Sequence, residues 1–144
     1  MAATTTLAFA GVNVGDQLPE EIIELTPTLI IASAIATRDF QDVHHDYGLA
    51  QERGMPNIFM NILSTNGLVG RFVTDWAGPK ATVADFGVRF SSPVVVPDDD
   101  VGAAITVSGQ VEGKLDGNRV ALALTARSAE TKVLTRARAV VRLP

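Results

Sequence analysis

The chain has 144 residues, of which 47% are hydrophobic and 19% are charged, and its formal net charge is −4. This composition is typical of a folded globular protein, and the length suits a single domain over residues 1–144. The acidic balance leaves no broad basic surface for nucleic acid or for an anionic membrane. With no cysteine, the chain has no disulfide, thiolate nucleophile or thiolate metal ligand.

No apolar run approaches the roughly 20 residues that a membrane-spanning helix needs. The opening residues, MAATTTLAFAGVNVGD, lack the basic segment with which a signal peptide begins. The sequence therefore predicts a cytoplasmic location.

The first half of the chain predicts a strand and two helices separated by polar residues. EIIELT, residues 21–26, is compatible with a strand, and the Thr-Pro pair at its end supplies an N-cap and a proline for a helix that follows. That helix must end near Arg38, because residues 39–46 hold no apolar periodicity. A short helix, DYGLAQER, then ends at Gly54.

Residues 57–76, NIFMNILSTNGLVGRFVTDW, carry the clearest helical pattern, since apolar residues recur at steps of three and four. Asn57 can cap the start of this helix, and a Gly-Pro pair ends it. Gly67 and Gly70 lower helix propensity by up to about 1 kcal/mol each relative to alanine. We expect them to permit close approach of another backbone, as in a helix wrapped by a sheet.

After Pro79 the hydrophobic period changes from that of a helix to that of a strand. Four segments alternate apolar with polar or small residues: residues 84–90, 103–111, 120–126 and 133–142. Asp116-Gly117 and residues 129–131 read as hairpin connections, so the sheet is largely antiparallel. One long buried helix and one antiparallel sheet predict an α+β fold.

RDFQDVHHDYGLA, residues 38–50, contains both histidines of the chain and lies between two predicted helices. Asp39 and His44 are five residues apart. A carboxylate and an imidazole in one pocket can hold a water between them and divide the roles of base and acid, as the addition of water to an activated double bond requires. Equally, Asp39 can cap a turn while His44 is a hydrogen-bonded histidine beside the core helix. The spacing alone leaves both interpretations open.

The other polar residues of this segment are interpreted as structural. His45 points away from its neighbour in most backbone geometries, and Asp42 and Asp46 suit a turn and a helix start. A zinc site is rejected, because adjacent histidines rarely converge on one metal and the usual spacing of three or four is missing. The sequence contains no motif for a hydrolase triad, a phosphate-binding loop or a dinucleotide-binding fold. Together with the rejected zinc site, this predicts that the protein uses neither a metal nor a cofactor.

The order of these features resembles the MaoC-like (R)-specific enoyl-CoA hydratases, a family of hotdog folds, over essentially the whole chain. The family motif is Asp-x-Asn-Pro-x-His with an alanine after five further residues. Here DFQDVH runs from Asp39 to His44 and is followed by Ala50, while Gln41 and Asp42 replace the usual Asn and Pro. The resemblance implies an antiparallel sheet wrapped around a long central helix, with Asp39 and His44 as the catalytic pair.

RDFQDVHHD, NIL, GLV and RFVTDWAGP resemble more closely the small MaoC-like subunit of actinobacterial steroid side-chain enoyl-CoA hydratases. In that group, the resemblance implies, the small subunit carries the Asp/His pair and associates with a second hotdog subunit that lacks it. A single hotdog leaves a sheet edge exposed, so a homodimer or a heteromer is expected, with acyl-CoA bound at the junction.

The resemblance therefore implies reversible hydration of a trans-2-enoyl-CoA to a 3-hydroxyacyl-CoA. Asp39 and His44 would orient one water, and backbone N–H groups at the start of the central helix would stabilise charge on the thioester oxygen. Alignment with the family places these donors near Met60 and Asn61. Two other classes stay open. One is a hotdog acyl-CoA thioesterase, whose usual Asp-x-x-Gly-His pattern is absent, and the other is a non-catalytic subunit that only binds acyl-CoA.

Overall fold

The computed structural model describes residues 5–144. The first half contains η1 (Phe9–Gly11), β1 (Gln17–Leu25), α1 (Pro27–Ala36), η2 (Asp42–His44), α2 (Tyr47–Glu52), β2 (Phe59–Met60) and α3 (Ile62–Ala77), where η denotes a 3₁₀ turn. The second half is composed of strands: β3 (Thr82–Phe90), β4 (Val94–Val95), β5 (Ala103–Leu115), β6 (Arg119–Ser128), β7 (Thr131–Lys132) and β8 (Leu134–Arg142).

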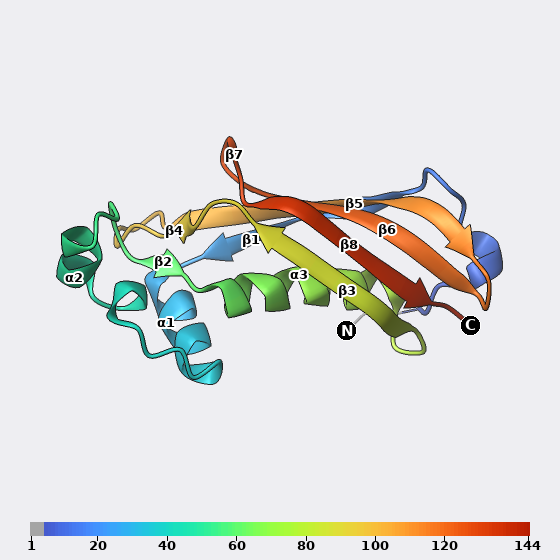
Figure 1. Cartoon of the computed structure of the whole chain (residues 1–144), viewed down its shortest axis with the longest axis horizontal. Helices are drawn as coiled ribbons and strands as arrows, with labels where there is room; N and C mark the ends of the chain where they lie inside the picture. The colour runs from blue at the N-terminus through green and yellow to red at the C-terminus, as the bar shows by residue number, and fades with distance from the viewer. Residues whose placement is uncertain (1–4) are drawn as a thin grey trace.

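The main sheet has the strand order β1-β5-β6-β8-β3, with the short β7 added to β6, and every pairing is antiparallel. The helix α3 lies against one face of this sheet (Figure 1). The helices α1 and α2 lie beyond the N-terminal end of α3. The hairpin between β5 and β6 turns through Gly117 and Asn118, both at positive φ, as a tight hairpin requires. The α+β architecture and the antiparallel sheet predicted from the sequence are confirmed.

The core lies between α3 and the sheet. Burial alternates along β6 and β8, so that one side chain in two faces the helix. Val69, Phe72 and Val73 on α3 pack in the same cluster as Leu122 and Leu134 from the sheet. Burying one such side chain stabilises the fold by roughly 1.5–3 kcal/mol, so the alternation fixes which face of each strand meets α3.

The start of the long helix differs from the prediction. The sequence predicts a helix from Asn57, whereas α3 begins at Ile62 and its N-cap is Asn61, whose side chain accepts a hydrogen bond from the Ser64 N–H at 2.8 Å. The segment before it is extended because β2 pairs with β4 in a separate two-stranded ladder. A long-range strand pairing has overridden a local helical pattern.

The predicted role of the two helix glycines is also wrong. Among the described residues, a Cβ added at Gly67 would meet no atom within 4 Å, and one at Gly70 would meet only the Phe86 side chain, at 3.9 Å. Close backbone approach occurs at the end of the helix instead, where a Cβ on Gly78 would lie 2.5 Å from the Thr6 Cα. Neither glycine is therefore needed for close packing of α3 against another backbone. No helix within residues 5–144 is long and apolar enough to cross a membrane.

Candidate active site

Asp39 is held at the end of α1 by a helix-terminating motif. The Arg38 N–H donates to the Ile35 carbonyl at 3.0 Å, and the Asp39 N–H donates to the Ala34 carbonyl at 2.9 Å. With Arg38 at φ 58, this is the hydrogen-bond pattern of a Schellman motif, which usually has glycine at the left-handed position. The motif fixes the backbone from which the Asp39 carboxylate projects.

His44 ends the 3₁₀ turn η2, which leads into α2. Asp46 caps α2 by accepting a hydrogen bond from the Leu49 N–H at 3.0 Å, which agrees with its predicted role at a helix start. Arg53, just past the end of α2, pairs with Asp42 of η2 at 2.6 Å. The His44 side chain is 5% exposed, so it is directed inward from this turn.

The imidazole of His44 connects two segments of the chain. Its Nδ1 lies 2.7 Å from the Phe59 carbonyl oxygen, and its Nε2 lies 3.2 Å from Oδ2 of Asp39. A carbonyl oxygen can only accept, so Nδ1 carries a proton and Nε2 faces the carboxylate. A neutral ring would then direct a lone pair at an ionised carboxylate. The contact between Nε2 and Asp39 becomes a hydrogen bond when one proton lies between these two groups.

The side chain of Asn61 completes the site. Its Nδ2 donates to Oδ2 of Asp39 at 3.1 Å and to Oγ1 of Thr37 at 2.8 Å, while its Oδ1 accepts the capping bond from Ser64. The residue is 2% exposed. The sequence interpretation named only the backbone of Asn61 and missed this side chain. The signal that could have found it is an N-cap residue type four places after the mistaken helix start.

Asp39, His44 and Asn61 line one cavity of about 500 Å³ at the N-terminal end of α3. Ile62 and Leu63, in the first turn of the helix, line it as well and are 60% and 52% exposed. The Asp39 side chain is 17% exposed, and both Asp39 and His44 are accessible from this cavity. The structure brings together the two residues whose spacing left their roles open.

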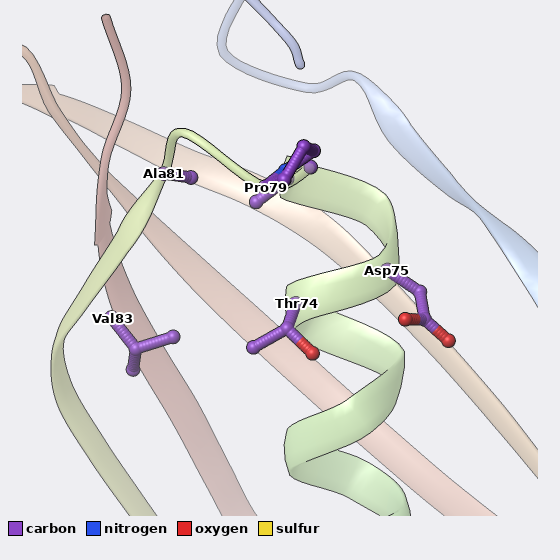
Figure 2. Close-up of a pocket in the computed structure, with 7 residues that line it drawn as sticks. Thr74, Asp75, Pro79, Ala81 and Val83 are labelled. Atoms are coloured by element: carbon purple, nitrogen blue, oxygen red, sulfur yellow. The ribbon is translucent and has the colours of Figure 1, made fainter. Parts of the chain in front are cut away.

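A second hollow, of about 580 Å³, lies at the opposite end of α3. Figure 2 shows Thr74 and Asp75 from the last turns of the helix beside Pro79, Ala81 and Val83 from the connection to β3 and its first residues. This hollow contains neither Asp39 nor His44. Among the residues that line it, none is a histidine, so it offers no carboxylate–imidazole pair.

The remaining polar residues of the segment agree with their structural interpretation. His45 is exposed, while His44 beside it is buried. Within residues 5–144, no group of three or more His, Asp or Glu side chains is arranged to hold a metal ion.

The fold and site together define an α+β domain with a carboxylate–imidazole pair at the start of its central helix. This chain belongs to the MaoC-like domain family, whose match covers residues 9–130. It is 47% identical over 104 residues to the beta subunit of the 3-oxo-4,17-pregnadiene-20-carboxyl-CoA hydratase of Mycobacterium tuberculosis, covering 72% of this chain and 77% of that one.

Solved structures show the same architecture. The ChsH1–ChsH2 complex from Mycobacterium tuberculosis contains a chain that matches with a TM-score of 0.82 and 38% identity, over 92% of this chain and 98% of that chain. The unliganded R-hydratase PhaJ1 from Pseudomonas aeruginosa matches with a TM-score of 0.84 over 96% of this chain and 86% of that one, at 22% identity, which shows the fold alone. The hotdog architecture implied by the sequence resemblance is confirmed.

Proposed function

We propose that this chain is the catalytic subunit of a hydratase that adds water reversibly across the C2=C3 bond of a 2-enoyl-CoA. The observation that carries the proposal is the contact between Asp39 and His44 in one cavity, 3.2 Å from Oδ2 to Nε2. Hydration requires a group that removes a proton from water and a group that delivers one to carbon, and the pair supplies both.

The proton balance of the pair fits this reaction. Water loses a proton to the pair as its oxygen bonds to C3, and the pair returns a proton to C2, so the pair ends with the number of protons it began with. Oδ2 of Asp39 is occupied by Asn61 and His44, whereas Oδ1 has only a weak contact, 3.5 Å, from the Gln41 N–H. Oδ1 is therefore the carboxylate oxygen with free capacity for the water.

The thioester oxygen needs donors near the start of α3, where the helix dipole also favours negative charge. Of the two residues named from the family alignment, Met60 is paired with Val94, and this register directs its N–H into the ladder. Asn61 is extended, with φ −72 and ψ 156, so its N–H points to the same side as the Phe59 carbonyl that meets His44. We favour the Asn61 N–H, with that of Ile62 in the first helical turn.

The finer assignments are supported by resemblance. The (R) configuration of the product follows the family motif around Asp39 and His44. A steroid side-chain enoyl-CoA is the proposed substrate because a relative 47% identical to this chain is named as a pregnadiene-carboxyl-CoA hydratase subunit. The cytoplasmic location stays a prediction from the sequence.

A second hotdog subunit is the proposed partner, as in the complex whose chain is 38% identical. β3 is a terminal strand of the sheet, and all nine of its residues are exposed or half-buried. Phe86, Val88 and Phe90 on this strand pack against the core without being fully covered. An edge of this length with apolar side chains beside it favours pairing with another sheet.

The test is loss of enoyl-thioester absorbance when the purified chain is added to a short enoyl-CoA and to a steroid enoyl-CoA, alone and with a candidate partner subunit. Coupling the product to a dehydrogenase specific for the (R)-3-hydroxyacyl-CoA reads the stereochemistry. Release of free thiol without loss of the double bond would identify a thioesterase instead. Tight acyl-CoA binding with neither reaction in any combination would identify a binding subunit.

A further inference from the structure

The Asn61 side chain makes three of the four hydrogen bonds that a carboxamide can form, and both of its amide hydrogens are used. Its carbonyl oxygen caps α3 through Ser64, and its two amide hydrogens go to Asp39 and Thr37. The Thr37 hydroxyl in turn lies 2.8 Å from the Ser33 carbonyl, to which it donates, so its oxygen is free to accept from Asn61. A chain of hydrogen bonds therefore runs from α1 through Asn61 to the first turn of α3.

We propose that Asn61 is a positioning residue that orients the Asp39 carboxylate relative to His44 and to the start of α3. The inference rests on the proposed function and concerns the same site. The Asn61 amide holds Oδ2 at 3.1 Å, on the side where His44 approaches at 3.2 Å. With Oδ2 held in this way, Oδ1 is turned toward the cavity for the water.

The same amide fixes the separation between the Asp39 carboxylate and the start of α3, on which the reaction depends. The proton acceptor is on Asp39, at the end of α1, and the donors to the thioester oxygen are on the backbone at the start of α3. These groups lie on segments 22 residues apart in sequence, joined by one buried side chain. Small displacements of reacting groups lower rates strongly, so rigid support of this kind is expected at an acid–base site.

A simple capping role predicts different behaviour. Serine caps helices about as well as asparagine, so Asn61→Ser retains the bond to the Ser64 N–H but removes the amide that reaches Asp39. If Asn61 only caps the helix, this variant should behave as wild type. The matched control is Asp46→Ser, because Asp46 also accepts a capping bond three residues ahead, at Leu49, and does not line the cavity.

Asn61→Ser should lower kcat about 10-fold or more with KM changed less than about threefold, because orientation and not substrate affinity is lost. Asp46→Ser should leave both constants within about twofold. Thr37→Val removes the acceptor on the other side of the amide and should lower kcat by a smaller factor. An Asn61→Ser enzyme with more than half of the wild-type kcat would overturn the inference, whereas an inactive wild type would instead reject the proposed hydratase.

A measurement without substrate keeps the inference testable in that case. The chain has two histidines, one exposed and one buried, so the ¹⁵N signals of the His44 ring can be assigned and followed with pH. Asn61→Asp preserves the cap but places a carboxylate where the amide donated to Asp39, and this loss of the hydrogen bond should change the His44 ring signals. Unchanged His44 ring signals would show that residue 61 does not couple to the pair.

The charged groups around this ring are few. Asp39 is the ion-pair partner of His44, and Arg38 lines the same cavity. Asp42, in the same turn, pairs with Arg53 and has 27% of its side chain exposed. The Asp46→Ser control should leave the His44 signals in place, since that change lies on the exposed start of α2.

Discussion

Asp39→Asn is the substitution that tests the site most directly. Asparagine has the shape of aspartate, so the change leaves no cavity. At the position of Oδ2, an amide nitrogen would oppose the Asn61 NH₂ group, so the variant should place its oxygen there and retain the 3.1 Å bond. The cost is then the lost charge opposite the His44 proton, about 1–3 kcal/mol, or a melting-temperature decrease of roughly 2–4 °C per kcal/mol.

The effect on rate should be much larger than the effect on folding. An amide cannot take a proton from water, and acid–base catalysis by a positioned side chain contributes about 10²–10⁴-fold, equivalent to roughly 3–5 kcal/mol of barrier. The assay is the initial rate of enoyl-thioester absorbance loss by the assembled enzyme, beside a thermal melt of the same sample. A variant that retains more than a tenth of the wild-type rate would refute the assignment of Asp39 as a proton-transfer group.

Asp42→Asn is the matched control in the same loop. It makes the identical chemical change three residues later, where the carboxylate pairs with Arg53 at 2.6 Å. With 56% of the Arg53 side chain exposed, this ion pair contributes about 0.2–1 kcal/mol. Its removal should leave the hydration rate within about twofold, so a large loss in this control would mean that the loop as a whole is fragile.

Arg38→Gly should raise the melting temperature by a few degrees, because a left-handed residue costs roughly 1–2 kcal/mol that glycine avoids; an unchanged or lower value would contradict the strain assigned at φ 58. Gly109→Ala puts a Cβ 2.9 Å from a methyl of Leu124 and should cost about 1–3 kcal/mol in urea unfolding. On the same strand Gly113→Ala meets nothing within 4 Å among the described residues and should be neutral or stabilising, so equal costs would refute the packing argument.

The strands were predictable because burial on one face leaves a period of two in the sequence. This alternation predicts strands over residues 120–126 and 133–142, and β6 and β8 occupy Arg119–Ser128 and Leu134–Arg142. The same holds for α1, where the Thr-Pro pair marks the start and Thr26 accepts the capping bond from Leu29 at 3.2 Å. Signals of this kind are local, so they survive without knowledge of the rest of the chain.

The candidate pair was visible for a similar reason, since Asp39 and His44 are five residues apart. What supports the pair was not visible. Thr37 and Asn61 meet across 24 residues, and His44 and Phe59 across 15. Contacts of such separation leave no period or spacing in a single sequence. The meeting of α1, η2, β2 and α3 is decided by tertiary packing.

The mispredicted start of α3 has a functional reason. Had the helix begun at Asn57, the Phe59 carbonyl would accept the hydrogen bond of the residue four places ahead, as helical carbonyls do. It could not then face the His44 Nδ1–H at 2.7 Å. Asn61 would lie inside the helix, where its side chain could not cap the first turn. The β2–β4 ladder keeps residues 59–61 extended, and this short segment contributes both the acceptor that sets the His44 tautomer and the amide that holds Asp39. The pairing that overrides the local helical pattern is therefore part of how the site is built.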